Sequence, residues 1–322
     1  MASQSSLNTL AAISLAVFAL LAVPGCVGSN AENADAILAW GRKGLDDGRF
    51  MTPRAITIDE QDRLYVVDKT ARIQVFDRDG NFLRSWRTPE CLQGKPCGLS
   101  ISQDGHLMVC DTHYFRVLFY TYEGELLENR TIGGVNGRGP GEFGFLTDAV
   151  QDSLGNLYVS EYGDYDRIQK FTPKGEFVYQ WGEHGEGPGQ FQRPQGMLMD
   201  KHDHLWVADA SNGRIQIFDV SGEEPKFLRT WGSPGSQLGQ LGYPYELAFA
   251  GDEHILVCEF GNHRIQKFTL DGTSVGTWGG AGKEVGQLHQ PWSMCQDSTG
   301  SIHVVDSYNH RLQRFQFPKT IE

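Results

Sequence analysis

The amino-acid sequence predicts an all-β fold in which six repeated four-stranded sheets close into a ring. Three observations support this prediction: a phrase that recurs six times, a regular interval between its copies, and a strand that is missing from the last copy. The clearest copies are TARIQVFDRDG (70–80), DYDRIQKFTPKG (164–175), SNGRIQIFDVSG (211–222) and GNHRIQKFTLDG (261–272), and weaker ones lie at 113–124 and 308–317. Because a catalytic motif is normally used once, a phrase used six times is interpreted as scaffold.

The interval between the copies indicates the same architecture. The arginines of the six phrases follow one another at 44 to 51 residues, a period typical of propeller blades when it contains short β-rich runs. In the fourth copy, turn-forming residues separate the runs 196–200, 204–209, 214–219 and 226–231, which predicts four antiparallel strands. One such sheet cannot bury both of its faces alone, so we expect six of them to pack around an axis as a six-bladed β-propeller. The aligned arginines are Arg72, Arg116, Arg167, Arg214, Arg264 and Arg311.

The missing strand predicts how the ring closes. The sixth copy stops after its third strand, RLQRFQF (311–317), whereas other copies continue into a fourth strand that ends in tryptophan. The stretch DAILAWG (35–41), ahead of the first copy, supplies a matching strand that ends in Trp40. The sequence therefore predicts a propeller over residues 35–318, in which the N-terminal strand completes the last blade, and a tail at 319–322. The tryptophans that Trp40 matches are Trp86, Trp181, Trp231 and Trp278.

The N-terminal residues are typical of an export signal. Residues 1–25 carry no charged side chain, and their apolar run at 10–23 would span about 21 Å as a helix, short of the roughly 30 Å of a bilayer core. We therefore expect a signal peptide over 1–25. VPGC (23–26) resembles a bacterial lipobox, which implies a lipid-modified Cys26 and a tether over 26–34; cleavage nearby with an unmodified Cys26 is the alternative. The expected location is the bacterial cell envelope, periplasmic or cell-surface, with membrane contact only through the lipid anchor.

Charge and cysteine content narrow the partners and the chemistry. The formal net charge of −12 argues against nucleic acid, whose phosphates require a surplus of Lys and Arg. Export would place the six cysteines in an oxidising compartment, where Cys91 and Cys97 are close enough in sequence to form a disulfide. Cys110 and Cys258 share one repeat position and Cys295 falls in an expected strand, so these three are interpreted as buried fillers with inert thiols.

Each repeated arginine follows an acidic residue by four to six positions. An acid and an arginine that flank a turn can form a charge-assisted bridge between neighbouring strands, and six copies exclude a single active site. An aromatic residue four positions after each arginine is expected to pack in the core. The acids are Asp68, Asp111, Glu161, Asp209, Glu259 and Asp306, and the aromatic residues are Phe76, Tyr120, Phe171, Phe218, Phe268 and Phe315.

The phrases GNHRIQKF and YNHRLQRF, each behind a run that ends in an acid, resemble the NHL repeat. The resemblance covers 35 to about 318 and implies a six-bladed NHL propeller. It is specific for the fold and poor evidence of activity, because related propellers serve as protein and RNA platforms, sensor domains and lyases. His263 and His310 fall in the turns of these phrases and are interpreted as repeat residues.

The resemblance also places the candidate binding site. In such propellers the first strand of each blade is innermost and its start opens on the central channel, and here that start follows a proline in five copies. The residues just after it differ between copies and would form a polar and aromatic pocket, or else line a solvated channel without a ligand. The candidate ligand-binding residues are Arg54, Thr147, Asp148, Gln195, Tyr245, Glu246 and Trp292.

No catalytic residue and no cofactor is predicted. The peptide-amidating lyase that shares this repeat places zinc-binding His directly after the corresponding proline in some of its blades, and no such position is His here. Related lactonases use channel-facing carboxylates, which makes Asp148 and Glu246 weak candidates for a divalent cation such as Ca²⁺ or Zn²⁺. The leading hypothesis is an extracytoplasmic platform that recognises a protein, peptide or saccharide at the channel mouth. The alternative is a metal-dependent lyase or lactone hydrolase that works in the channel.

Overall fold

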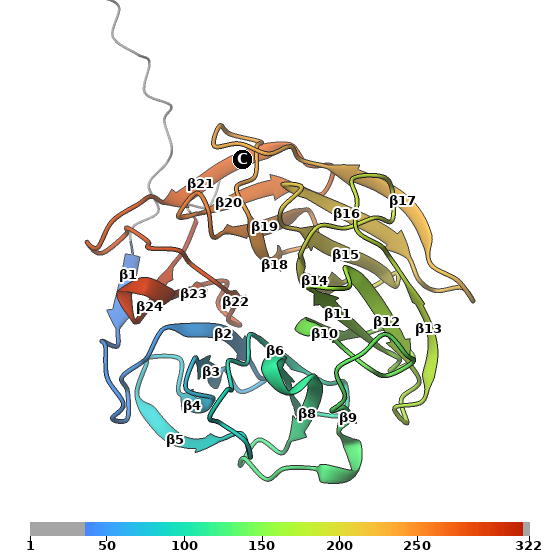
Figure 1. Ribbon diagram of the computed structural model, residues 1–322. Coiled ribbons are helices and arrows are strands. Elements are labelled where there is room, and N and C mark those ends of the chain that lie inside the picture. The colour runs from blue at the N-terminus through green and yellow to red at the C-terminus, as the bar shows by residue number, and fades with distance from the viewer. Residues whose placement is uncertain (1–35, 318–322) are drawn as a thin grey trace, which may run out of the picture. The chain divides into compact units, whose positions relative to one another are not determined.

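The computed structural model describes residues 36–317, so Cys26 and the expected signal peptide, tether and C-terminal tail lie outside the described residues. Residues 36–317 form six antiparallel four-stranded sheets arranged as blades around a central axis (Figure 1). This confirms the predicted all-β six-bladed propeller. In this part of the chain, no helix is both long and apolar enough to cross a bilayer.

The first three blades are built from consecutive strands. Blade 1 contains β2 (Pro53–Ile58), β3 (Leu64–Asp68), β4 (Arg72–Phe76) and β5 (Phe82–Arg87). Blade 2 contains β6 (Gly98–Ile101), β7 (Leu107–Asp111), β8 (Arg116–Tyr120) and β9 (Ile132–Gly133), with the short 3-10 helices η1 (Thr112–Tyr114) and η2 (Glu128–Arg130). Blade 3 contains β10 (Phe145–Gln151), β11 (Leu157–Tyr162), β12 (Arg167–Phe171) and β13 (Phe177–Trp181).

The last three blades include the one that closes the ring. Blade 4 contains β14 (Pro194–Met199), β15 (His204–Asp209), β16 (Arg214–Asp219) and β17 (Lys226–Trp231). Blade 5 contains β18 (Pro244–Ala250), β19 (His254–Glu259), β20 (Arg264–Thr269) and β21 (Ser274–Gly279). Blade 6 contains β22 (Met294–Gln296), β23 (Ile302–Asp306) and β24 (Arg311–Phe315), the 3-10 helix η3 (Ser307–Asn309) and, from the other end of the chain, β1 (Ala36–Trp40).

The first strand of each blade lies nearest the axis. Each of these strands contacts the first strands of both neighbouring blades, including β2 with β22, so the inner wall is continuous (Figure 1). The starts of these strands therefore converge on the axis, as the sequence predicts.

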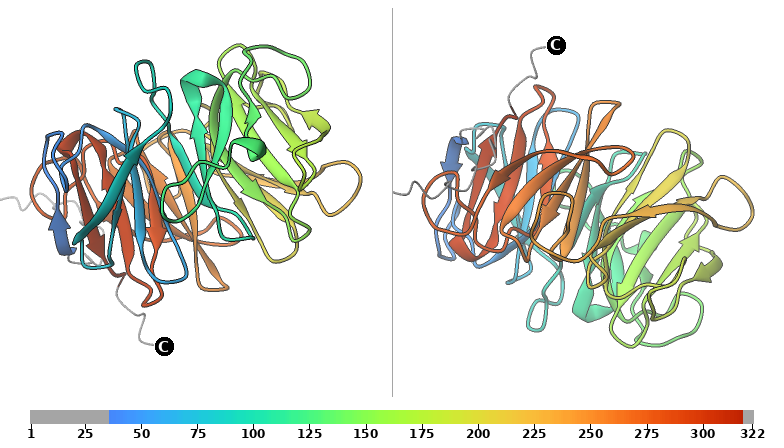
Figure 2. Two further views of the ribbon diagram at one scale, coloured as in Figure 1. Left: turned by 90° about the horizontal axis from the view of Figure 1, so that it is seen from below. Right: turned by 90° about the horizontal axis from the view of Figure 1, so that it is seen from above.

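The ring closes through the N-terminal strand. β1 pairs antiparallel with β24, with Trp40 opposite Leu312 (Figure 2). The ring of Trp40 lies edge-on to His303, 5.9 Å between centroids. The structure therefore confirms that the N-terminal strand completes the last blade and closes the ring.

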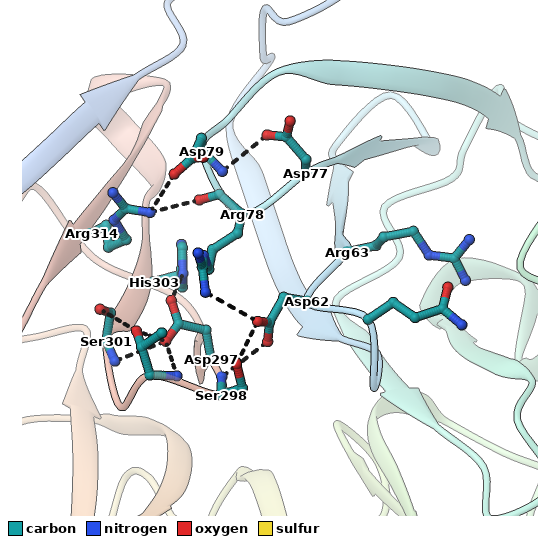
Figure 3. Close-up of polar contacts among 12 residues, drawn as sticks. Asp62, Arg63, Asp77, Arg78, Asp79, Asp297, Ser298, Ser301, His303 and Arg314 are labelled. Carbon is teal, nitrogen blue, oxygen red and sulfur yellow. Dashed lines mark hydrogen bonds and ion pairs between the residues drawn. The ribbon is translucent and has the colours of Figure 1, made fainter.

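Polar contacts reinforce the seam between blades 6 and 1 (Figure 3). Ser298 donates to Asp62 through its amide and its hydroxyl, at 3.0 and 2.6 Å. Ser153 makes the same two bonds with Asp203 between blades 3 and 4. The seam that joins the chain's two ends thus reuses a contact found inside the repeat array. Arg314 adds an ion pair with Asp79 across the seam.

Each repeated arginine forms the predicted ion pair with its acid. The N–O distances run from 2.6 Å for Arg167–Glu161 to 3.5 Å for Arg72–Asp68, and all six carboxylates are buried. The pair joins the second and third strands of one blade, as the register of β15 with β16 shows. The other four pairs are Arg116–Asp111, Arg214–Asp209, Arg264–Glu259 and Arg311–Asp306.

The glutamine two residues after the arginine explains the rest of the R-I-Q phrase. Gln216 donates to the Gln190 carbonyl (2.7 Å) and accepts from the Gly189 amide (3.0 Å), both in the loop that leads into its blade. Arg214 donates to the same Gln190 carbonyl at 2.9 Å. Together the two side chains hold the backbone of a Gly-rich loop that has no regular structure of its own. Equivalent glutamine contacts are made by Gln74, Gln169, Gln266 and Gln313.

The apolar core lies between adjacent blades. The six aromatic residues that follow the arginines are all buried, at no more than 2% exposure. Cys110, Cys258 and Cys295 are also buried, and burial raises the pKa of each thiol. The prediction of inert filler thiols agrees with this environment.

Candidate functional site at the channel mouth

Three of the predicted mouth residues contact one another. The guanidinium of Arg54, in β2, lies 4.7 Å from the ring centroid of Trp292, which precedes β22. The Trp292 ring meets Tyr245, in β18, edge-on at 5.1 Å. Residues of blades 1, 6 and 5 thus form a continuous contact around the start of the inner strands.

Three residues that sequence reasoning missed extend this contact. Phe260, after β19, stacks on Tyr245 at 4.5 Å and also meets Trp292 edge-on at 5.4 Å. Arg193 lies over the rings of Tyr245 (5.6 Å) and Tyr162 (4.9 Å). We call the set Arg54, Trp292, Tyr245, Phe260, Arg193 and Tyr162 the mouth cluster.

The two arginines of the mouth cluster have no acidic partner. Among residues 36–317, neither guanidinium forms an ion pair, and the Nε atom of each is buried without a hydrogen-bond acceptor. Arg54 donates once, from Nη1 to the Lys95 carbonyl at 3.2 Å. Buried polar groups are normally paired, so two arginines held on aromatic faces are available to an anionic group from outside.

Arg193 reaches the mouth because of the backbone turn ahead of β14. It precedes Pro194 and has φ 59°, and residues at equivalent places before other first strands share this left-handed conformation. The position before the proline was the sequence signal that could have identified Arg193. The prediction considered only the positions after the proline. The other left-handed residues before a first-strand proline are Thr52, Tyr243 and Gln290.

The side chains of two predicted site residues form hydrogen bonds within the scaffold. The hydroxyl of Thr147 lies 2.6 Å from that of Ser160, and the amide of Gln195 donates to the Pro194 carbonyl at 3.3 Å. Both side chains are only 4% exposed. Thr147 thus bonds between β10 and β11, Gln195 bonds to the residue before it, and neither belongs to the mouth cluster.

Asp148 and Glu246 lie one position further along their strands, where neighbouring first strands approach closely at Gly98 and Gly196. A Cβ on Gly98 would lie 2.4 Å from the Thr147 carbonyl oxygen, and one on Gly196 would lie 2.7 Å from Glu246 Oε1. The first strands of neighbouring blades therefore approach too closely for a Cβ atom at Gly98 and Gly196.

The two carboxyl groups are bonded only to uncharged partners. Asp148 accepts from the amides of Ala149 and Met197, each at 2.8 Å. Glu246 accepts from the Leu247 amide and the Ser293 hydroxyl, each at 3.0 Å. Burial raises the pKa of Asp148 to about 7, and burial and the charge of Asp148 raise that of Glu246 well above its ordinary value. The two carboxyl groups therefore bind protons at a higher pH than ordinary carboxyl groups do.

A cavity of about 360 Å³ begins at these carboxyl groups. Its walls are mostly apolar residues from further along the inner strands, such as Leu99, Met197 and Met294, and it does not include the mouth cluster. No group of three or more His, Cys, Asp or Glu side chains placed to hold a metal is found in the described part of the chain. Asp148 and Glu246 alone supply the acidic ligands that a cation would meet here.

The predicted disulfide is not formed in the structure. Cys91 and Cys97 are both free thiols, because Cys97 points inward, with Sγ 2.9 Å from the Thr112 hydroxyl and 3.4 Å from the Leu146 carbonyl. Closeness in sequence predicted the pairing, but the turn between the two residues directs Cys97 into the ring.

Comparison with known proteins identifies the repeat. The NHL repeat model matches residues 191–218 and 288–315, which contain the phrases of blades 4 and 6. The chain therefore contains NHL repeats and folds as a six-bladed propeller. The rat peptidylglycine alpha-amidating monooxygenase is 33% identical over 196 residues, 58% of this chain and 19% of that protein. The human NHL repeat-containing protein 3 is 27% identical over 171 residues, 47% of this chain and 46% of that protein. The NHL chain thus spans less than half the length of these relatives.

A solved structure supports the ring architecture over most of the NHL chain. The virginiamycin B lyase of Staphylococcus aureus has a TM-score of 0.61 at 15% identity, over 87% of this chain and 98% of that one. At this identity the likeness concerns the fold alone. The NHL propeller is a fold that supports protein-interaction platforms, and its structural neighbours include lyases.

Proposed function

We propose that this protein is an extracytoplasmic binding platform whose mouth cluster recognises a carboxylate group of a protein or peptide partner. The observation that carries the proposal is the pair of arginines, Arg54 and Arg193, that lie on aromatic rings with no acidic partner among residues 36–317. A guanidinium donates paired hydrogen bonds that match the two oxygens of a carboxylate.

The surroundings of the two arginines favour such a ligand. Burial raises the pKa of Tyr245 to about 12, so its phenol stays neutral and can donate a hydrogen bond. The rings of Trp292 and Phe260 offer apolar surface beside the charges. The protein as a whole carries a formal charge of −12, which makes two unpaired cations at one site a local exception.

Export, lipidation of Cys26 and an envelope location belong to the proposal through the N-terminal sequence. A saccharide partner is less well supported than a peptide, because unpaired arginines select charge. The fold of the NHL propeller supports protein interaction, and the relatives do not extend this to a particular partner.

The test uses four probes labelled at the N-terminus with an uncharged fluorophore: hexaglutamate and hexaglutamine, each with a free or an amidated C-terminus. Binding to the purified protein is measured by fluorescence anisotropy. Both hexaglutamates binding would identify side-chain carboxylates, and only the free-ended peptides binding would identify the terminal carboxylate. Equal binding of amidated hexaglutamine would overturn the proposal.

The arginines are tested separately. Arg54→Gln and Arg193→Gln should each weaken binding by about tenfold or more, the loss expected for a charge-assisted hydrogen bond. Arg229→Gln is the matched control, because Arg229 also lies over an aromatic ring, Trp206 at 5.5 Å, but on the outer strand β17. Equal losses in all three variants would show that net charge and not the mouth cluster governs binding.

One observation favours a second candidate, a metal-dependent lyase or lactone hydrolase in the channel. Asp148 and Glu246 line a 360 Å³ cavity, and burial raises the pKa of both, as general acids and bases require. Elemental analysis after dialysis discriminates the two functions: a stoichiometric divalent metal that disappears in Asp148→Asn would favour the enzyme.

A further inference from the structure

Two histidines of the repeated phrase bond to the turns that begin neighbouring blades. His263, in blade 5, accepts at Nδ1 from the Gln290 amide at 2.9 Å, and His310, in blade 6, accepts at Nδ1 from the Thr52 amide at 3.0 Å. These residues were interpreted from sequence as repeat residues only. The structure assigns them a contact that crosses from one blade to the next.

The turns that they hold are strained. Gln290 and Thr52 have φ 50° and φ 53°, a left-handed conformation that is unfavourable for a residue with a side chain. Each is followed by a proline, which further restricts it. A third turn of this kind, at Arg193, is held in the same way by Asp166 Oδ1 at 3.0 Å. Because the conformation is unfavourable alone, the acceptor on the preceding blade helps to maintain it.

Only an unprotonated imidazole can make the bond. A histidine that accepts at Nδ1 carries its proton at Nε2, and a second proton turns Nδ1 into a donor that faces the amide. Asp166, in contrast, accepts through a carboxylate oxygen. Blades 5 and 6 thus use a neutral imidazole as the acceptor where blade 3 uses a carboxylate.

The charged groups around each histidine are known. His263 faces His289, which lowers its pKa, and Asp306, which raises it, and burial is the largest cause and lowers it. His310 faces Lys43 and Lys69, which lower its pKa, and Asp306, which raises it, and burial again dominates and lowers it. Both histidines are therefore neutral at pH 7, and both bonds are lost as the pH falls below their depressed values.

The two turns directly precede the mouth cluster. Gln290 lies two residues before Trp292, and Thr52 lies two residues before Arg54. We propose that His263 and His310 are positioning residues that place Trp292 and Arg54 for binding while unprotonated and release them on acidification. The inference rests on the proposed function in that it gives the mouth cluster a pH-dependent affinity.

The first experiment needs no ligand. Hydrogen exchange by NMR gives the protection factors of the Gln290 and Thr52 amides in the wild-type protein between pH 7.5 and 5. We expect protection at both amides to fall by about tenfold, on the order of one hydrogen bond, while the Arg193 amide keeps its protection. Constant protection at Gln290 and Thr52 across this range would overturn the inference.

The chain itself supplies the conservative variant. His263→Asp and His310→Asp copy the acceptor that Asp166 provides in blade 3, and aspartate tolerates the left-handed backbone of both sites, φ 55° and 57°. Both variants should keep protection down to pH 5, whereas His263→Ala and His310→Ala should lack it at every pH. His202→Gln, in the turn at the far end of the inner strands, is the control for a histidine without this contact.

A second measurement tests the link to binding. The affinity for labelled hexaglutamate should fall on acidification from pH 7.5 to 5.5 in the wild-type protein and fall less in the His263→Asp/His310→Asp double variant. If no probe binds at any pH, the proposed function fails, while the exchange experiment still decides the role of the histidines. If the probe binds and both proteins lose affinity equally, the histidines do not control the mouth.

Discussion

The guanidinium of Arg54 lies 4.7 Å from the ring centroid of Trp292, so a residue of the first blade rests on a residue of the last. The two residues come from opposite ends of the chain and meet only because β1 completes blade 6 and brings β2 beside β22. The mouth cluster is therefore complete only in a closed ring. Binding and closure should fail together whenever the seam between these blades opens.

Replacing Trp292 and Tyr245 together by alanine should abolish capture of the partner without unfolding the protein. Both rings contact Phe260, and each lies against one of the two arginines, so their loss removes the surface that holds the two cations. Anisotropy with labelled hexaglutamate and a thermal melt give the two readouts. Trp292→Phe keeps a ring at the site and should retain most of the affinity. Unchanged capture by the double variant would mean that the wrong face has been assigned.

Glu246→Gln should make the stability of the protein less dependent on pH between pH 5 and pH 8. The pKa of Asp148 is raised to about 7 in the folded protein, so the folded state binds more protons than the unfolded state above about pH 4, and stability falls as the pH rises towards 7. The cost should be on the order of a few kcal/mol. Glutamine removes one acid and the repulsion that it exerts on Asp148. Urea unfolding at pH 5 and pH 8 measures the difference, which should shrink in the variant; an identical difference in both proteins would contradict it.

Deleting residues 35–41 should open the ring. Without β1, strand β24 becomes an exposed edge, and the contacts of Trp40 with His303 and Leu312 are lost. We expect a lower melting temperature, a less cooperative transition and loss of hexaglutamate binding. Leu154→Ala, at a 75% exposed position, is the control and should melt like the wild type. A truncated protein that also melts like the wild type would show that β1 does not carry the closure.

Arg264→Met should cost about 3–5 kcal/mol of unfolding free energy, because it leaves the buried Glu259 without its charged partner. Lys201→Met removes an ion pair with Asp252 whose two side chains are 68% and 85% exposed, and should cost less than about 1 kcal/mol. Urea unfolding at pH 7 compares the two. Similar costs would mean that burial does not set the value of the repeated bridge.

The scaffold could be predicted from the sequence because the residues that form each of its contacts recur in several copies of the repeat. Six acid–arginine pairs at near-constant spacing could belong only to a structural bridge, and the missing last strand located the closure. The mouth cluster was predicted in part. Arg54, Tyr245 and Trp292 follow a recognisable proline, whereas Arg193 enters through a left-handed turn and Phe260 through ring stacking between blades, neither of which a repeat alignment reveals.

Some side-chain contacts of the predicted residues could not be foreseen from the repeat, for a common reason. Thr147 and Gln195 have the right position in the repeat, but their side chains bond within the wall, and Cys97 turns inward, away from Cys91. Position along a strand follows from periodicity, while the direction of a single side chain depends on the neighbouring blade. The roles of His263 and His310 were missed for the same reason, since their partners lie on the next blade.

In blades 1 and 3 to 6, the arginine and glutamine of the repeated phrase hold the loop that leads into the blade through its peptide groups. Gln216 bonds to the Gln190 carbonyl and the Gly189 amide, and neither contact involves the side chain of the loop residue. The solvent-facing side chains of these loops can thus vary, since most substitutions leave the hydrogen bonds to the main chain intact. Evolution could change the side chains that these loops present to solvent, or a designer could graft new segments into the loops, while the blades keep their positions.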